Sequence, residues 1–338
     1  MSAAVRAIAA AVALLLGVWP APSARAAEPA AYFSGVIVPM LTPYREGDVR
    51  QVDLDALRQH ALWLCQQRVS ALFAVSGVGQ WDLLTPAEKQ RIIRTVVAAA
   101  AGRKPVIAGV GGRSATETLA VARFAIAEGA TALAIVTPAF LRKAEPLAQA
   151  TLLAYYAEIA DALPRDVPIL VYDARGELQP ETMLRLSERP NIRAMKYRTD
   201  SAKAMTRMAM ALGDRVAVLG GIEDATLATL AVGGKGVIGG GANAFPNEIA
   251  DIVDRFRAGD QAGALRAQQR VLELNEVLDS SVELKLLLRE LAGIPIAYNA
   301  RTGDAASPVA EPLALDPARV ARLRTYFAPF VKPVAAAD

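Results

Sequence analysis

The feature that most constrains the fold of this 338-residue chain is a regular alternation of short apolar runs and amphipathic stretches. The apolar runs are rich in Val, Ile, Leu and Ala, which is typical of strands buried on both faces of a parallel sheet. Each run is therefore predicted to form a strand. The predicted strands are Gly35–Met40, Ala71–Ser76, Pro105–Val110, Ala132–Thr137, Pro168–Tyr172, Ile192–Lys196, Val216–Gly220 and Gly236–Gly240.

The stretches between these runs carry helix signals. Thr85-Pro86-Ala87-Glu88 combines a capping residue, a proline at the first helical position and an early acid, and Glu128-Gly129 is a typical helix end. The predicted helices are Asp53–Gln67, Pro86–Ala101, Ala115–Glu128, Leu147–Ala162, Pro180–Ser187, Ala202–Leu212, Asp224–Val232 and Pro246–Arg257.

The resulting strand–helix units span residues 32–258, close to the roughly 250 residues typical of a (β/α)8 barrel. The main alternative is a doubly wound open sheet, which usually has fewer strands and a glycine-rich phosphate loop after the first one. Here the first strand leads into Met40-Leu41-Thr42-Pro43 instead. The sequence therefore predicts an α/β fold of the (β/α)8 TIM barrel type.

Residues 259–330 depart from this alternation. They contain helix patterns without intervening strands, so we expect a C-terminal helical extension packed on the barrel. An Ala-rich tail, residues 331–338, follows it. The predicted helices of the extension are Asp260–Leu278, Ser281–Leu291 and Pro317–Phe327, the last two separated by the loop Gly293–Pro312.

Residues 1–26 have the pattern of a signal peptide. Arg6 precedes the apolar run Ala7–Val18, and Ala24-Arg25-Ala26 resembles a cleavage site. The run is short for a membrane span, although a retained anchor is the alternative. We therefore expect an exported protein, located in the periplasm, with no stable membrane association after the signal is removed.

Charge and rare residues exclude several classes of function. Removing residues 1–26 takes away Arg6 and Arg25, so the formal charge falls from +3 to +3 − 2 = +1. The sequence contains no basic stripe of the kind that indicates a nucleic-acid partner, so none is expected. The one cysteine, Cys65, and the one histidine, His60, are five apart in one predicted helix and do not face each other. No metal site and no Cys–His or Ser–His pair is therefore expected.

Lys196 is the main candidate for chemistry. Alternation along its strand places Ile192, Ala194 and Lys196 on one face, so the amine ends an apolar row. Desolvation disfavours a charged amine, and a neutral one can attack a carbonyl to form a Schiff base. In a barrel, catalytic groups lie at the C-terminal ends of the strands, where Lys196 falls. The alternative is a lysine that marks a strand end and reaches water with its tip.

Tyr172 ends the preceding strand and alternates in phase with Lys196, so we expect the two side chains to be neighbours at the barrel mouth. A phenol beside an amine can transfer protons during imine formation; the alternative is a tyrosine packed in the upper layer of the barrel core. The turn Ser76–Gln80 offers backbone N–H groups to a carboxylate. Arg175 is a second candidate carboxylate partner, or else a solvated loop residue.

Several motifs together resemble the dihydrodipicolinate synthase / N-acetylneuraminate lyase family, and the resemblance covers most of the sequence after the signal region. It implies a (β/α)8 fold, class I Schiff-base chemistry on pyruvate or another 2-oxo acid, no cofactor beyond the covalent imine, and a homo-oligomer, either dimer or tetramer. The motifs are Gly35–Pro43, Ser76–Gln80, Pro105–Gly111, Val136–Pro138, Leu170–Tyr172, Pro180–Thr182 with Lys196 beyond it, and Gly233–Ile238.

The resemblance implies roles for individual residues. Lys196 takes the place of the Schiff-base lysine and Tyr172 that of the proton-transferring tyrosine. Ile238 lines the site beside the lysine. The substrate carboxylate would lie against Gly77, Val78 and Gly79. Three departures from the family pattern accompany these matches: Gly77-Val78 replaces a pair of hydroxyl residues, Phe140 replaces a tyrosine, and the loop that carries Arg175 is shorter.

We therefore expect a Schiff-base-forming lyase or aldolase that cleaves or forms a carbon–carbon bond or removes water from a 2-oxo acid. The alternatives are 4-hydroxy-tetrahydrodipicolinate synthase proper and an exported, non-catalytic relative that binds a 2-oxo acid. The loss of the hydroxyls at positions 77 and 140 disfavours the synthase.

Overall fold

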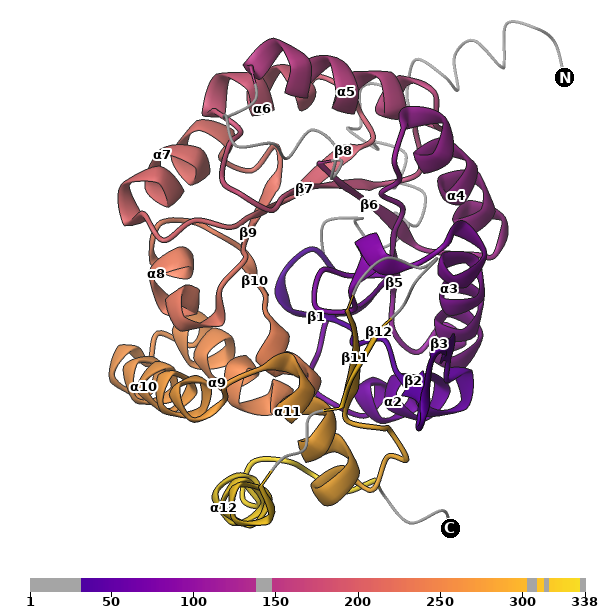
Figure 1. The fold of residues 1–338 in the computed structure, drawn as a ribbon. Coiled ribbons are helices and arrows are strands. Elements are labelled where there is room, and N and C mark those ends of the chain that lie inside the picture. Colours follow the sequence, from indigo (N-terminus) through magenta and orange to yellow (C-terminus); the bar gives the residue numbers. More distant parts are fainter. Residues whose placement is uncertain (1–31, 138–147, 303–308, 313–315, 335–338) are drawn as a thin grey trace, which may run out of the picture.

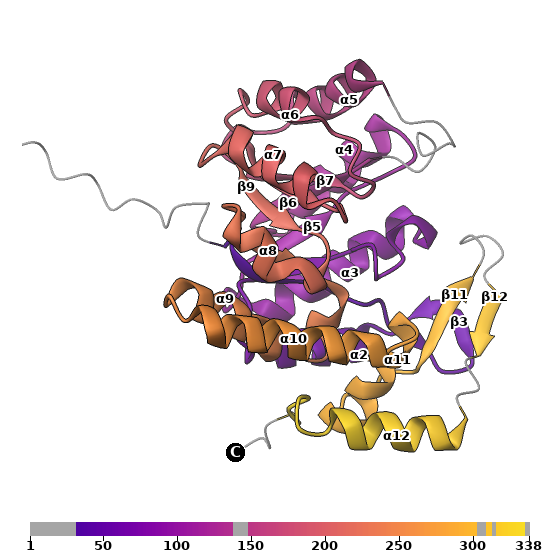
Figure 2. The same ribbon diagram turned by 90° about the vertical axis from the view of Figure 1, so that its left-hand side faces the viewer.

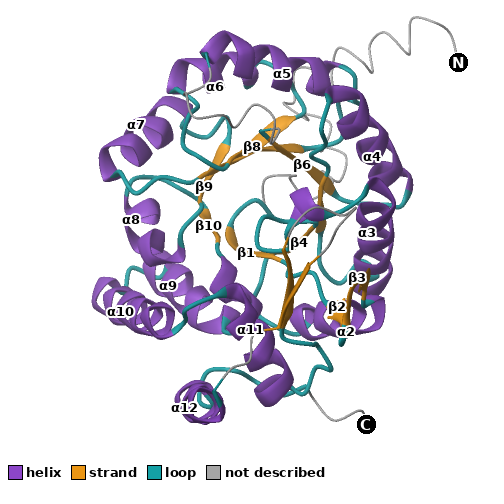
Figure 3. Cartoon of the chain, viewed as in Figure 1, coloured by secondary structure: helices purple, strands orange, loops and turns teal. Residues whose placement is uncertain are grey.

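The computed structural model describes residues 32–137, 148–302, 309–312 and 316–334. Its centre is a closed barrel of parallel strands in the order β1-β10-β9-β8-β7-β6-β5-β4, surrounded by helices (Figures 1 and 3). The predicted (β/α)8 barrel is thus confirmed. The barrel strands are β1 (Gly35–Pro39), β4 (Ala71–Ala74), β5 (Val106–Gly109), β6 (Ala132–Val136), β7 (Ile169–Asp173), β8 (Ile192–Tyr197), β9 (Ala217–Gly220) and β10 (Gly236–Ile238).

Every residue of these strands is buried except Arg193, because helices cover the outside and side chains fill the inside. This burial on both faces explains why the strands read as continuous apolar runs. The surrounding helices are α2 (Leu54–Cys65), α3 (Pro86–Ala100), α4 (Ala115–Ala127), α5 (Gln149–Asp161), α6 (Pro180–Leu186), α7 (Ala202–Leu212), α8 (Thr226–Ala231) and α9 (Pro246–Arg257).

The helix signals in the sequence act as predicted. Thr85 and Glu88 form a reciprocal capping box at the start of α3, with Pro86 in its first turn. Element ends differ from the predicted ones by a residue or two; β4, for example, ends at Ala74 rather than Ser76. The predicted signal segment 1–26, Phe140 and residues 335–338 of the tail lie outside the described residues.

The C-terminal extension contains helices α10 (Gln261–Val277), α11 (Ser281–Leu287) and α12 (Pro317–Phe327), with a π-helical turn, Leu288–Ala292, after α11. The prediction that the extension has no strands is wrong. Within the predicted loop, β11 (Asn299–Thr302) pairs antiparallel with β12 (Val309–Pro312). A second unpredicted hairpin, β2 (Tyr44–Arg45) with β3 (Asp48–Val52), follows β1.

The two hairpins contact each other, so the C-terminal segment returns to the N-terminal part of the barrel (Figure 2). Arg301 of β11 forms this connection. Its guanidinium is 1% exposed, pairs with Glu88 at 2.8 Å and donates to the carbonyl oxygens of Val49 and Leu83. A buried charge requires a partner, and Arg301 finds its partner 213 residues away in the sequence. No local sequence pattern could indicate this pair.

The extension also buries a second lysine. Lys285 of α11 is 3% exposed, donates to the carbonyl oxygen of Asn299 at 2.6 Å and lies 5.0 Å from the ring centroid of Tyr44. Burial lowers the pKa of Lys285 to about 7. Within the residues described, no helix has the length and apolar character needed to cross a bilayer.

Candidate active site

Lys196 and Tyr172 meet at the C-terminal ends of β8 and β7. The two residues are paired in the parallel register of these strands, as the in-phase alternation predicted. Lys196 Nζ donates to Tyr172 Oη at 3.4 Å and lies 4.4 Å from the centroid of the phenol ring. Lys196 is 6% and Tyr172 7% exposed. The structure therefore places a buried amine against a buried phenol where barrel enzymes carry their chemistry.

Neighbouring residues fix the position of Tyr172. The hydroxyl of Tyr156, on α5, donates to the carbonyl oxygen of Tyr172 at 3.1 Å and is also bonded to Thr137 at 2.9 Å. Phe73 of β4 packs edge-on against the Tyr172 ring, with the centroids 6.2 Å apart. These contacts hold the backbone and the ring of Tyr172, which orients its hydroxyl before any ligand binds.

Asp173, the last residue of β7, organises the loop that follows. Its carboxylate accepts from the N–H groups of Arg175, Glu177 and Leu178. Burial raises the pKa of the Asp173 carboxyl, and these N–H donors partly oppose the increase. The Arg175 guanidinium forms an ion pair with Glu177 at 2.9 Å and is 38% exposed. A substrate carboxylate would therefore have to compete with Glu177 for this arginine.

The Ser76–Gln80 turn is tied to the end of β1. Ser76 Oγ donates to the carbonyl oxygen of Met40 at 2.9 Å, and Thr42 Oγ1 donates to the carbonyl oxygen of Gly79 at 2.6 Å. The N–H of Gly79 donates to Ser76 Oγ at 3.2 Å. Among the described residues, neither the N–H of Gly77 nor that of Val78 donates a hydrogen bond. These two donors, rather than all three predicted ones, are available to a carboxylate.

The conformation at Val75 directs this turn towards the barrel mouth. Val75 has a φ of 58°, in the left-handed region that a β-branched residue rarely adopts. Its carbonyl oxygen packs against Gly109, where an added Cβ would lie only 2.0 Å from that oxygen. Such strain is retained where the surrounding structure holds it, and it is common beside functional sites.

Gly77 faces the hydroxyl of Tyr172. A Cβ added at Gly77 would lie 2.9 Å from Tyr172 Oη, and a Cβ added at Gly240 would lie 3.3 Å from Val78 Cγ1. The turn thus lies between the tyrosine and the end of β10. The structure therefore brings together Lys196, Tyr172, Gly77 and Val78. Because residue 77 is a glycine, it offers no side-chain hydroxyl to Tyr172.

The end of β10 supplies Ile238, which is fully buried and pairs with Ile37. The next residue, Gly239, reveals a site residue that sequence reasoning missed. A Cβ there would lie 2.0 Å from Oε2 of Glu223, an acid in the turn after β9. Burial raises the pKa of the Glu223 carboxyl, and attraction to Lys196 is among the smaller effects that lower it. The glycine run 239–241 after a strand was the available signal.

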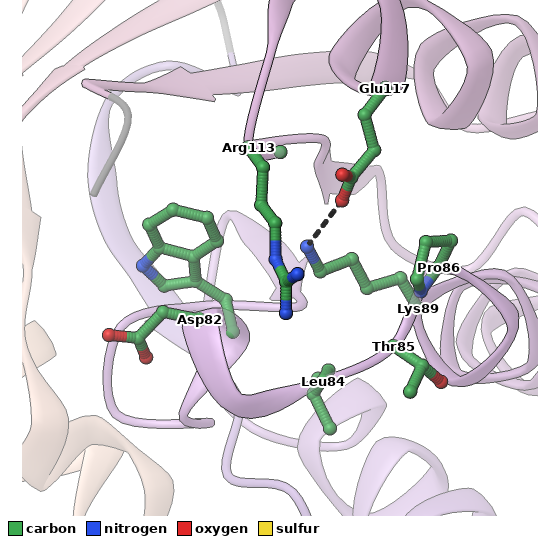
Figure 4. A pocket seen from close by; sticks show the side chains of 9 residues that line it. Asp82, Leu84, Thr85, Pro86, Lys89, Arg113 and Glu117 are labelled. Atoms are coloured by element: carbon green, nitrogen blue, oxygen red, sulfur yellow. Dashed lines mark ion pairs between the residues drawn. The ribbon is translucent and has the colours of Figure 1, made fainter. Parts of the chain in front are cut away.

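A separate cavity of about 320 Å³ lies beyond the Ser76–Gln80 turn, and its lining includes Trp81, Lys89, Arg113 and Glu117 (Figure 4). Lys89 is 2% exposed, donates to the carbonyl oxygen of Gly111 at 2.8 Å and lies 3.8 Å from Glu117. None of the predicted site residues lines this cavity. Its lysine contacts a backbone carbonyl oxygen and a carboxylate, whereas Lys196 contacts the hydroxyl of Tyr172.

Comparisons with known proteins agree with this arrangement. Residues 32–301 match the model of the dihydrodipicolinate synthetase family. The chain is 33% identical over 250 residues to 4-hydroxy-tetrahydrodipicolinate synthase of Citrifermentans bemidjiense, covering 73% of this chain and 83% of that protein. It is 35% identical over 250 residues to the synthase of Sorangium cellulosum, covering 72% and 81%.

A solved structure has the same fold. YagE, a prophage protein of the dihydrodipicolinic acid synthase family from E. coli K12, was crystallised in complex with pyruvate. It matches with a TM-score of 0.76 and 25% identity, over 88% of this chain and 98% of that one. The extent of these matches, added to the barrel and its lysine–tyrosine pair, shows that the chain belongs to the dihydrodipicolinate synthetase family and is a lyase of that family.

Proposed function

We propose that Lys196 condenses with pyruvate or another 2-oxo acid to form a Schiff base, and that the resulting iminium promotes cleavage or formation of a carbon–carbon bond or loss of water. The observation that carries the proposal is the 3.4 Å contact between the buried Lys196 amine and the Tyr172 hydroxyl. The pyruvate complex of YagE supports the same class of ligand.

Each residue of the site has a role in this scheme. The neutral amine of Lys196 attacks the keto carbon, and Tyr172 transfers the proton from nitrogen to the developing alkoxide. The N–H groups of Gly77 and Val78 bind the substrate carboxylate. Ile238 and the other apolar side chains at the barrel end exclude water, which strengthens these interactions.

The glycine at position 77 favours a substrate other than that of the synthases. A hydroxyl side chain there would extend a proton relay from Tyr172, and Gly77 cannot do so. We therefore propose a lyase, aldolase or dehydratase acting on 4-hydroxy-2-oxo acids, whose own hydroxyl can occupy the space beside Tyr172. The lack of a hydroxyl side chain at position 77 also favours a second candidate function, that of a protein that binds a 2-oxo acid without turnover.

We further propose that residues 1–26 are a signal peptide, that the mature chain works in the periplasm, and that it is a homodimer or homotetramer. The apolar run after Arg6 and the cleavage-like Ala24-Arg25-Ala26 support export. Fractionation of the expressing cells and the mass of the periplasmic form test the proposed localisation. Release of a form that begins at residue 27 is expected, and a full-length cytoplasmic protein would refute export.

Turnover of a panel of 4-hydroxy-2-oxo acids tests the activity. We expect release of pyruvate or loss of water, abolished in Lys196→Arg and retained in Lys203→Arg, a matched change at an exposed lysine of α7. Condensation of pyruvate with aspartate semialdehyde, at a rate above that on the panel, would point to the synthase reaction instead. Binding of 2-oxo acids with no turnover of any kind would favour the binding protein.

A further inference from the structure

Glu223 is a buried acid at the barrel mouth that the proposed scheme does not yet use. It lies in the turn after β9. Strand β8, which carries Lys196, has β7 on one side and β9 on the other, and Lys196 is in register with Tyr172 of β7 and with Leu219 of β9. Tyr172 and Glu223 thus belong to the two strands that border β8, Tyr172 at the end of β7 and Glu223 just beyond β9.

The turn after β10 is built around this carboxyl group. Oε1 of Glu223 accepts from the N–H of Gly241 at 2.6 Å. Oε2 occupies the space beside Gly239, where a Cβ would lie 2.0 Å from it, and a Cβ at Gly241 would lie 2.9 Å from Oε1. Any larger residue at position 239 would displace the acid. The two glycines therefore hold the carboxyl group in place next to Ile238.

Glu223 is paired with no cation. Among the described residues it takes part in no ion pair, and attraction to Lys196 is one of the smaller effects that lower the pKa of its carboxyl. Burial raises the pKa of that carboxyl, so it retains a proton to a higher pH than an exposed glutamate. The amine and the acid form no ion pair among the described residues, and the mechanism below places the atoms bound to Lys196 between them.

We propose that Glu223 is the proton-transfer residue for dehydration of the carbinolamine formed at Lys196, a role that rests on the Schiff-base function proposed above. The protonated carboxyl gives its proton to the carbinolamine hydroxyl, the C–O bond breaks, and water leaves. The nitrogen lone pair forms the C=N bond, which yields an iminium cation and the Glu223 carboxylate.

If Glu223 had only a structural role, Glu223→Gln would leave the rate of imine formation unchanged. The hydrogen bond from Gly241 can be accepted equally well by the amide oxygen of glutamine, which has almost the same shape. Glu223→Gln therefore preserves the packing of the turn and removes only the transferable proton. Loss of proton transfer is worth roughly 10²- to 10⁴-fold in rate.

The test is the rate at which pyruvate becomes trapped by borohydride, followed by intact mass at timed quenches and repeated across the pH range. We expect Glu223→Gln to slow trapping at least 10²-fold and to lose the decline in rate that the wild type shows as the carboxyl deprotonates. We also expect formate to accelerate trapping by Glu223→Ala, because a small acid can occupy the vacated space. Trapping by Glu223→Gln at the wild-type rate and with the wild-type pH profile would overturn the assignment.

A measurement on the wild type covers the case in which the variants do not fold. Infrared difference spectra on adding pyruvate should lose the carbonyl stretch of a protonated carboxylic acid as the iminium accumulates. An unchanged carboxylic acid band beside a trapped adduct would overturn the role of Glu223 alone. The absence of any adduct on the wild type would overturn the Schiff-base function, and the role of Glu223 with it.

Discussion

The chain has one histidine, and its protonation should contribute a loss of stability as pH falls below neutrality. His60 is fully buried in α2, and its Nε2 lies 3.3 Å from the carbonyl oxygen of Asn243. Because a carbonyl only accepts, the ring carries its proton on Nε2, which leaves Nδ1 buried without a hydrogen-bond partner among the described residues. Asn243 in turn bonds to Leu41 and Pro39, so this contact supports the end of β1.

Burial lowers the pKa of His60 from 6.5 to about 4, against a smaller raising effect of the bond to Asn243. Between these values the unfolded chain binds a proton that the folded chain does not, so stability is lost as pH falls from 6.5 towards 4. The full shift corresponds to about 3 kcal/mol. By pH 5 the contribution of His60 to this loss, relative to pH 7.5, should be about 2 kcal/mol.

Urea unfolding of the wild type and of His60→Gln, at a series of pH values between 7.5 and 5, measures this change in the free energy of unfolding. Glutamine retains an N–H donor for Asn243 and has no proton to bind, so the variant should show a flatter dependence by about 2 kcal/mol. The single histidine ring resonance in proton NMR should stay that of neutral imidazole down to pH 5. A ring that titrates near pH 6.5 in the folded protein, or equal slopes for the two proteins, would refute the reasoning.

Three further predictions follow from other contacts. Tyr172→Phe keeps the ring packing but removes the hydroxyl beside the amine, so imine formation should slow roughly 10²- to 10⁴-fold with an unchanged unfolding midpoint; an unaffected rate would exclude proton transfer by Tyr172. Arg301→Met leaves a buried carboxylate unpaired and should cost about 3–5 kcal/mol in urea unfolding, whereas Arg94→Met, at an exposed ion pair, should change little; equal losses would contradict this. Gly79→Ala puts a Cβ 2.6 Å from the backbone oxygen of Met40 and should destabilise the fold by about 1–3 kcal/mol in the same assay; a neutral effect would show that the turn adapts.

Much of the barrel was predictable because each local pattern agrees with the global fold. Strands buried on both faces leave apolar runs, and the helices between them carry their own caps, as at Thr85 and Glu88. The register of Tyr172 with Lys196 followed from alternation along two adjacent strands. The pairing of amine and phenol was therefore accessible from sequence before their contact distance was known.

Other features depend on tertiary packing and leave little local signal. Glu223 is three residues beyond the end of β9, and only the folded barrel reveals that Gly239 and Gly241 make room for its carboxyl group. The β11–β12 hairpin lies in a segment that reads as a loop, and its stability depends on the distant partner of Arg301. Such contacts join residues far apart in the chain, which no periodicity can indicate.

The most direct test of the account is to identify the residue that pyruvate modifies. After incubation with pyruvate and reduction by borohydride, intact mass should show one added reduced pyruvyl group, and peptide mapping should place it on Lys196, not on the equally buried Lys285. Lys196→Arg should show no adduct. An adduct that maps to another lysine, or a wild-type protein that none of the tested 2-oxo acids modifies, would contradict the central claim.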